Sequence, residues 1–299
     1  MLKTYIEAAR LRTLPLSISG IIVAGFLAQF TGVFNLLIFV LSILVTLSFQ
    51  ILSNYANDYG DGVKGTDNEN RIGPARAIQS GAISPRQLKK VIVINGFVSA
   101  ILSLTLIYVS FGRENLLLTL AFIGLGAASI WAAIRYTVGE KAYGYRGLGD
   151  VFVFLFFGLV SVLGGYFLYA ENFQIAFVLP GVSIGLLSTA VLNLNNLRDR
   201  DSDKISNKIT VVVSLGVKRS KIYHTLLVLI PLLSSLAFNY VYDLLAFQNF
   251  IYLIAFLPLI QNLVVVWNNT EAVDLDPELK KVALSTFLYS LLFGISISL

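Results

Sequence analysis

Residues 35–56 read NLLIFVLSILVTLSFQILSNYA, and this stretch decides the fold class. It holds no charged residue, and as a helix it is long enough to cross the ~30 Å hydrocarbon core of a bilayer. Similar apolar runs recur along the chain. They cover residues 14–31, 91–111, 115–134, 149–170, 174–196, 222–241, 244–266 and 282–298. Together they predict an all-α membrane protein, a single domain over residues 1–299 built as a bundle of about nine transmembrane helices.

The composition agrees with a chain that faces lipid. Hydrophobic residues make up 56% of the sequence and charged residues only 13%, whereas an ordinary soluble domain is about one-quarter charged. The chain has no cysteine, which excludes a disulfide, a thiolate metal site and an iron–sulfur cluster within it.

The basic residues predict how the helices are oriented. Of the 22 lysines and arginines, only Arg113 falls on one set of alternate connections, and all the others fall on the opposite set. Because cationic loops stay on the cytoplasmic side during insertion, we expect a cytoplasmic N-terminus, an external C-terminus and a multi-pass protein of the inner (cytoplasmic) membrane. The long polar loops, and any active site that they form over an intramembrane chamber, then face the cytoplasm.

The net charge is +5, and the basic residues lie in polar loops that also carry most of the acidic residues. That mixture favours anionic membrane lipid or a phosphate-bearing substrate as partner and argues against nucleic acid. The sequence leaves the oligomeric state open.

A first acidic motif follows the apolar run 35–56. Residues 57–61 read NDYGD. If the helix continues into this loop, Asn54, Asp58 and Asp61 share one face, because residues three and four apart are neighbours on a helix.

A second acidic motif follows the run 174–196, where residues 195–203 read NNLRDRDSD. Asn195, Asp199 and Asp203 again share one face of a continued helix. The two motifs are four spans apart and enter the membrane in the same direction, as a parallel internal duplication would place them.

The chemistry of these motifs points to a metal-bound diphosphate. Clustered carboxylates repel one another unless a cation lies between them, and oxygen ligands suit a hard cation such as Mg²⁺ rather than zinc. Lys64, Arg71 and Arg76 stand among the acids, and such cations suit phosphate oxygens. A site of this kind could stabilise a departing diphosphate while membrane helices keep water from the allylic cation left behind.

The sequence resembles the UbiA superfamily of intramembrane aromatic prenyltransferases over essentially its whole length. The superfamily's Asn-Asp-x-x-Asp motif is matched by residues 57–61, and its Asp-x-x-x-Asp motif by residues 199–203. The stretches 57–81 (NDYGDGVKGTDNENRIGPARAIQSG) and 135–158 (RYTVGEKAYGYRGLGDVFVFLFFG) look like its 1,4-dihydroxy-2-naphthoate polyprenyltransferase branch. Many superfamily members have a third aspartate four residues after the second; here that position is Gly65 and the next acid is Asp67.

This resemblance implies roles for particular residues. The implied Mg²⁺ ligands are Asn57, Asp58, Asp61, Asp67, Asp199 and Asp203. The aspartates implied to act in catalysis are Asp58, Asp61, Asp199 and Asp203. The residues implied to hold the diphosphate are Lys64, Arg71, Arg76, Lys141, Arg146 and Asn195. Further candidates for substrate binding, from their place in the sequence, are Arg12, Asn54, Tyr136, Tyr143 and Arg198. The implied reaction transfers a polyprenyl group from polyprenyl diphosphate to dihydroxynaphthoate with loss of its carboxylate, giving demethylmenaquinone.

Other interpretations remain open at the level of sequence. A single acidic loop residue is usually solvated, the loop cations could serve topology or lipid binding, and tyrosines such as Tyr136 are commonly interfacial anchors. His224, the only histidine, is expected at the membrane interface. A related prenyltransferase could use 4-hydroxybenzoate or homogentisate, and a secondary transporter could use the paired acids to bind coupling ions.

Overall fold

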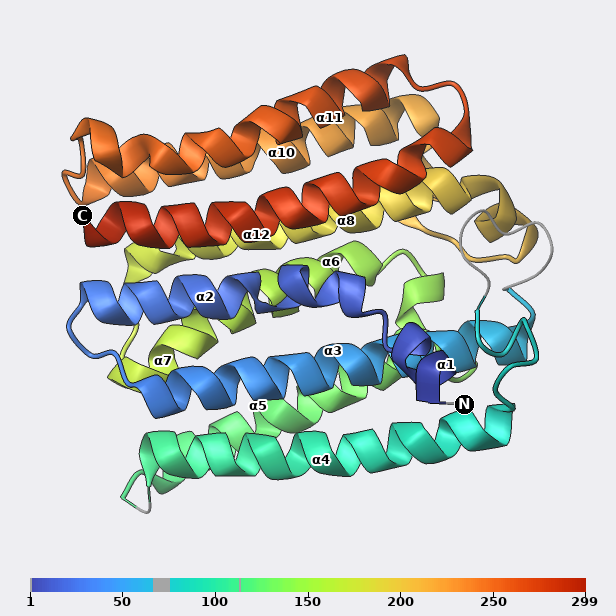
Figure 1. The fold of residues 1–299 in the computed structure, drawn as a ribbon, viewed down its shortest axis with the longest axis horizontal. Coiled ribbons are helices and arrows are strands. Elements are labelled where there is room, and N and C mark those ends of the chain that lie inside the picture. The colour runs from blue at the N-terminus through green and yellow to red at the C-terminus, as the bar shows by residue number, and fades with distance from the viewer. Residues whose placement is uncertain (1, 67–75, 113) are drawn as a thin grey trace.

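The computed structural model describes residues 2–66, 76–112 and 114–299, and these residues form a helical bundle (Figure 1). Nine helical segments of the described chain are long and apolar enough to cross a membrane, so all nine predicted spans are confirmed. Four of them are single helices, α3 (Leu36–Lys64), α4 (Pro85–Phe111), α5 (Leu116–Arg135) and α10 (Val217–Val241). Four others begin in a shorter helical segment and continue as α2 (Leu14–Phe30), α8 (Val178–Ile205), α11 (Phe256–Asn268) and α12 (Asp276–Ser298).

The fifth span changes its winding on the way through the bundle. It begins as α6 (Gly149–Val153), widens into the π-helix η3 (Phe154–Gly164) and returns to α-helix as α7 (Gly165–Ala170). Gly158 of η3 lies against α8 so closely that a Cβ there would be 2.6 Å from the Gly185 Cα atom. An apolar run does not distinguish π from α winding, so the sequence predicted only the span.

Short segments complete the chain. They are α1 (Leu2–Ala8), η1 (Leu11–Thr13), η2 (Tyr143–Tyr145), η4 (Ile175–Phe177), α9 (Val211–Leu215), η5 (Phe247–Ala255) and η6 (Ala272–Leu275). The third span begins before its apolar run, at a capping motif. Ser84 caps α4 and Pro85 is its first residue, and the Gln87 side chain completes a capping box with Ser84.

Two helices extend beyond the apolar spans predicted for them, and both matter for function. Helix α3 runs on through Asp61 and stops at Gly65, whose φ of 71° lies in the left-handed region that favours glycine. Helix α8 runs on through Asp203 to Ile205. Both helices therefore continue through their acidic motifs, so the spaced residues of each motif share one helix face, as predicted.

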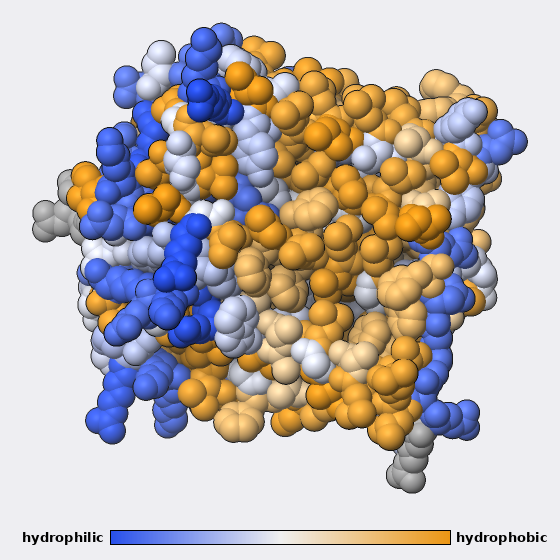
Figure 2. All heavy atoms as spheres, turned by 180° about the vertical axis from the view of Figure 1, so that it is seen from behind, coloured by the Kyte–Doolittle hydropathy of each residue, from blue (hydrophilic) through white to orange (hydrophobic). Residues whose placement is uncertain are grey.

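Both extended ends lie at the same end of the bundle, and the two chain termini lie at opposite ends (Figure 1). Seen from behind, a broad apolar belt separates two polar edges, and hydrophilic residues gather most densely at the edge that carries the ends of α3 and α8 (Figure 2). This distribution is that of a membrane protein with its polar functional groups on one side.

The described core falls into separate clusters around the two halves of the bundle. The largest joins α2 with α8, α10, α11 and α12 and includes fully buried Phe177, Phe238 and Phe293. A second joins α1, α3, the segment 77–83 and α4 through Leu52 and Leu88. Helix α5 contributes only Ala132 to the fully buried set, because part of its inner face lines a cavity.

Candidate active site

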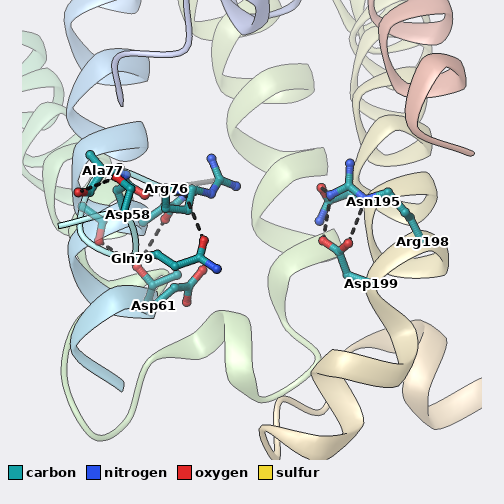
Figure 3. A network of polar contacts seen from close by, with 12 residues as sticks. Asp58, Asp61, Arg76, Ala77, Gln79, Asn195, Arg198 and Asp199 are labelled. Carbon is teal, nitrogen blue, oxygen red and sulfur yellow. Dashed lines mark hydrogen bonds and ion pairs between the residues drawn. The ribbon is translucent and has the colours of Figure 1, made fainter. Parts of the chain in front are cut away.

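The first acidic motif lies at the membrane-surface end of α3. Asp58 is 1% exposed. Its Oδ2 accepts a hydrogen bond from the Ala77 backbone N–H at 3.3 Å, and its Oδ1 lies 3.9 Å from Nε of Arg76. The partly buried Asp61 has a different partner, because its Oδ1 accepts a hydrogen bond from the Tyr145 hydroxyl at 2.7 Å. The two aspartates are thus held by different connections, although they lie together at the end of α3 (Figure 3).

The second acidic motif, on α8, is organised by Arg198. This arginine is 2% exposed, and it donates to both carboxylate oxygens of Asp199 at 2.7 and 2.8 Å. It also donates to Oδ1 of Asn195 at 2.9 Å and to Asp276 at the start of α12. Figure 3 shows this cluster opposite the α3 cluster. Asp203, one turn further along α8, pairs instead with Lys208.

Lys208 connects the two motifs. Its Nζ lies 3.6 Å from Oδ1 of Asp203, and it also interacts electrostatically with Asp61. Burial by itself lowers the pKa of Lys208, but the carboxylates of Asp61 and Asp203 more than offset this, so the pKa is raised above its ordinary value. The buried ammonium group of Lys208 therefore pairs with Asp203 of α8 and interacts at longer range with Asp61 of α3.

The loop that carries Lys208 is fixed to the connection between α5 and α6. The Ile209 N–H donates to the carbonyl oxygen of Tyr145 at 3.2 Å, and Arg146 forms an isolated bridge with Ile209. The Tyr145 hydroxyl contacts Asp61 and lies 2.6 Å from Oγ1 of Thr66. Burial, followed by the charge of Asp61, raises the pKa of Tyr145. Tyr145 is thus a neutral hydrogen-bond donor to Asp61 across the physiological pH range.

Two further predicted residues adjoin this centre. Nζ of Lys64 lies 3.9 Å from the centroid of the Tyr145 ring, a cation–π contact. Tyr136 interacts electrostatically with Lys208, Asp61 and Asp203, and burial raises its pKa to about 12. Tyr136 is therefore protonated at neutral pH and can donate a hydrogen bond.

A cavity of about 340 Å³ opens beside these groups and extends between the helices. Asn57, Tyr136 and Tyr143 line it at the polar end, and Leu106 and Phe122 line it deeper in the bundle. Aliphatic and aromatic side chains make up most of its wall. The arrangement places a charged, oxygen-rich centre next to an apolar chamber.

Several residues predicted to bind substrates have other contacts in the structure. The Asn54 amide donates to the Ala9 carbonyl oxygen at 2.8 Å and to Thr13 Oγ1 at 3.1 Å, so it fixes the N-terminal segment to α3. The Tyr143 hydroxyl donates to the Ala132 carbonyl oxygen at 2.7 Å. Arg12, Lys141 and Arg146 are exposed. Asp67 and Arg71 lie outside the described residues.

A family model described as the UbiA prenyltransferase family matches residues 18–291. The chain belongs to this family. The 1,4-dihydroxy-2-naphthoate octaprenyltransferase of Haemophilus influenzae is 40% identical over 299 residues, which cover 99% of this chain and 96% of the relative. The enzyme of the same name from Escherichia coli is 39% identical over 297 residues, covering 99% and 96%. The predicted resemblance to the family is thereby confirmed.

Solved structures support the fold. A UbiA homolog from Archaeoglobus fulgidus bound to DMAPP and Mg²⁺ superposes with a TM-score of 0.63 over 99% of each chain, at 15% sequence identity. A digeranylgeranylglyceryl phosphate synthase superposes with the same score at 21% identity, covering 100% of this chain and 99% of the other. At these identities the likeness shows that the family member described here has the UbiA fold.

The residues present fit a magnesium ion that is shared with a substrate. All the candidate ligands of the two motifs are carboxylate or amide oxygens, which Mg²⁺ prefers. Oδ2 of Asp203 is buried and accepts no hydrogen bond from the described residues. No three acidic or histidine side chains within the described ranges are close enough to hold a metal by themselves. Magnesium sites in proteins commonly use one or two carboxylates together with substrate phosphate oxygens.

Sequence reasoning missed two residues that the structure brings into this centre. Lys208 was counted only among the topology-determining cations, and its position five residues after Asp203 gave no sign of burial. Asp276 lies far along the chain from Arg198, and nothing in the spacing linked them. The sequence also gave no sign that Tyr145 contacts Asp61, because this hydrogen bond depends on the fold of the 143–146 turn.

The expected interfacial placement of His224 is wrong. The histidine is 0% exposed, and its Nε2 lies 2.8 Å from Oδ1 of Asn262. The Asn262 amide donates in turn to Glu278 at 2.7 Å. This network pins α10, α11 and α12 together inside the bundle, away from the two acidic motifs.

Proposed function

We propose that the protein transfers a polyprenyl group from polyprenyl diphosphate to 1,4-dihydroxy-2-naphthoate, with loss of the carboxylate as carbon dioxide, to give demethylmenaquinol, the reduced form of demethylmenaquinone. The observation that carries this proposal is that Lys208 lies between the acidic ends of α3 and α8, and that its neighbour Tyr136 lines an apolar cavity. The near-full-length similarity to enzymes named for this acceptor supports the choice of substrate.

The chain's own residues would hold the diphosphate head. Asp58, Asp61, Asp199 and Asp203, with Asn57, would hold Mg²⁺, while Lys64, Arg76 and Lys208 would contact phosphate oxygens. When bound, Mg²⁺ neutralises the negative charge that develops on the departing diphosphate. Tyr145 keeps Asp61 oriented toward the centre, and Arg198 does the same for Asp199.

The cavity would receive the hydrocarbon tail and exclude water. Breaking the allylic C–O bond leaves a carbocation at the first carbon of the prenyl chain, and water would trap it before the acceptor could. The apolar wall, with Phe122 and Leu125 from α5 and Phe156 from η3, leaves little to hydrate that carbon. The aromatic ring then attacks the carbocation, a carbon–carbon bond forms, and the carboxylate leaves as carbon dioxide.

Two alternatives to this function are another aromatic acceptor and a transporter. Another aromatic acid, such as 4-hydroxybenzoate or homogentisate, would need the same diphosphate centre and the same cavity, but the named relatives favour the naphthoate. A secondary transporter would bind coupling ions at the paired acids, and its activity would not need a prenyl diphosphate. Membership of a prenyltransferase family argues against the transporter.

The location in the cell follows from charge. Apart from Arg113, the lysines and arginines fall in or beside the alternate connections that include the acidic motifs. Hydrophilic residues are densest at that edge of the described bundle (Figure 2). By the positive-inside rule we assign this end to the cytoplasmic face of the inner membrane, with the N-terminus cytoplasmic and the C-terminus external. Soluble dihydroxynaphthoate would then reach the site from the cytoplasm, and the prenyl tail would enter from the lipid.

The proposal is tested by mass analysis of the product. The purified protein in lipid nanodiscs is incubated with Mg²⁺, a polyprenyl diphosphate and one acceptor at a time. We expect a prenylated naphthoquinol lighter by carbon dioxide than the simple adduct, and no product when Mg²⁺ is chelated. The absence of this product, or faster turnover of 4-hydroxybenzoate or homogentisate, would overturn the assignment.

A further inference from the structure

Arg198, a candidate for substrate binding from the sequence, directs its side chain to other residues of the protein. Its guanidinium donates to both oxygens of Asp199, to Asn195 and to Asp276, and the residue is 2% exposed. A guanidinium group has five N–H donors, so most of them are already engaged with these three side chains. Arg198 is thus occupied as an internal support of the second motif.

Asp276 reaches this support from another part of the chain. It is the first residue of α12, and α12 packs along α8. Its side chain is 36% exposed, compared with 2% for Arg198. The contact lies at the edge of the site, where a substitution at position 276 need not disturb the buried core.

The charges of the three groups show what Asp276 adds. Arg198 and Asp199 alone would form a closed pair without net charge, and a carboxylate already neutralised by a bidentate arginine is a weaker ligand for a divalent cation. With Asp276 bound to the other side of the guanidinium, the set formed by Arg198, Asp199 and Asp276 retains a net charge of −1. Two partners on opposite sides of a planar guanidinium also fix its orientation, and therefore that of Asp199 and Asn195.

We propose that Asp276 is a positioning residue for the diphosphate-binding centre: through Arg198 it orients Asn195 and Asp199 and keeps the second acidic motif negatively charged for a divalent cation. This proposal rests on the proposed function, because it assigns Asp276 a part in binding the same metal and diphosphate. Partners that hold metal ligands in place typically change metal affinity by about 10- to 100-fold when they are removed.

A purely structural role is the competing explanation, in which Asp276 only fastens α12 to α8. The structure already fastens α12 by other means, since Glu278 near its start binds Asn262 at 2.7 Å. If Asp276 only fastens α12, its substitution would lower the melting temperature and leave the metal concentration needed for half-saturation unchanged. The two explanations therefore differ in a measurable quantity other than product formation.

The test measures binding of Mn²⁺, a spectroscopically visible substitute for Mg²⁺, to the purified full-length protein without the aromatic acceptor. Free Mn²⁺ is followed by electron paramagnetic resonance in the presence of geranyl S-thiolodiphosphate, an unreactive analogue of a prenyl diphosphate. The variants are Asp276→Asn, which removes the charge at constant shape, and Asp276→Glu, which restores it. The matched control is Asp274→Asn, a nearby exposed acid of η6.

We expect half-saturation to require about tenfold more Mn²⁺ in Asp276→Asn, nearly the wild-type concentration in Asp276→Glu, and no change in Asp274→Asn. An unchanged Mn²⁺ requirement in Asp276→Asn, or an equal increase in Asp274→Asn, would overturn the positioning role. If the Asn variant does not fold, Asp276→Ser is judged by the same criterion, since serine is accepted at a helix start. Failure of the wild type to bind Mn²⁺ with the analogue would instead overturn the proposed function.

Discussion

The two acidic helix ends carry similar motifs but are supported in opposite ways. At the end of α8, Asp199 and Asn195 are held by Arg198 from the same helix. At the end of α3, the described side-chain partners of Asp58 and Asp61 come from other segments. Asp58 is held by the segment at residues 76–77, and Asp61 by Tyr145.

This difference shows that two similar acidic motifs can be positioned by different kinds of contact. The α8 end carries Arg198 as its own counter-charge to Asp199, while Asp276 of α12 and Lys208 supply further contacts to Arg198 and Asp203. The α3 end depends on the folding of two connections around it. Lys208 joins the two by lying near a carboxylate of each. The following predictions test this division of roles, from the largest expected effect to the smallest.

Removing a carboxylate from either end should have the largest effect. For Asp61→Ala and Asp199→Ala we expect prenyl transfer to fall by about a thousandfold or more, equivalent to about 4 kcal/mol of transition-state stabilisation. Product formation in nanodiscs measures this. The control is Asp201→Ala, because Asp201 is exposed and pairs only with Arg200 at 3.7 Å among the described residues. Near-normal turnover in either active-site variant would refute its role.

Removing the cation that joins the two ends should have the next largest effect. In Lys208→Met the buried Asp203 loses its counter-charge, so we expect turnover about a hundredfold lower and a reduced melting temperature without ligand. Mg²⁺ with a prenyl diphosphate should recover much of that stability, because it replaces the missing positive charge. The exposed Lys204→Met on the same helix end is the control. Equal behaviour of the two lysine variants would contradict the bridging role.

A smaller change is expected when only the support of Asp61 is removed. Tyr145→Phe deletes a hydrogen bond to a carboxylate, which is worth about 1.5 kcal/mol, so we expect turnover to fall by about tenfold. Thr66→Val removes the other partner of the same hydroxyl and leaves the Asp61 contact in place. It should change turnover less. The reverse order would show that Tyr145 does not act through Asp61.

The smallest effect concerns pH. The pKa of Lys208 is raised above its ordinary value of 10.5 in the folded protein, so its contribution to stability is fully present below pH 10.5 and is lost only as the pH rises further. The difference in melting temperature between wild type and Lys208→Met should therefore stay constant from pH 7 to about pH 10. A difference that already narrows at about pH 9 would mean that Lys208 is not held between carboxylates.

Apolar length and helix-face spacing were enough to predict the nine spans and to bring the two motifs to one end of the bundle. They could not predict the π-winding of η3, because an apolar run is compatible with either winding and the close packing of Gly158 against Gly185 of the next span, α8, is a tertiary contact. The residues that contact the aspartates, directly or through Arg198, could not be predicted from the sequence either. Lys208, Tyr145 and Asp276 reach the site through connections whose path is set by tertiary packing, and a basic residue in a polar loop resembles any other topology-determining cation.

The most direct test of the central claim is to locate the metal. Crystals grown with Mn²⁺ and geranyl S-thiolodiphosphate would reveal manganese by its anomalous scattering. The account predicts manganese at roughly 2.2 Å from carboxylate oxygens of both helix ends, with Asp58 or Asp61 on one side and Asp199 or Asp203 on the other, bridged by the diphosphate. Manganese bound to one helix end alone, or a diphosphate far from Lys208, would contradict it.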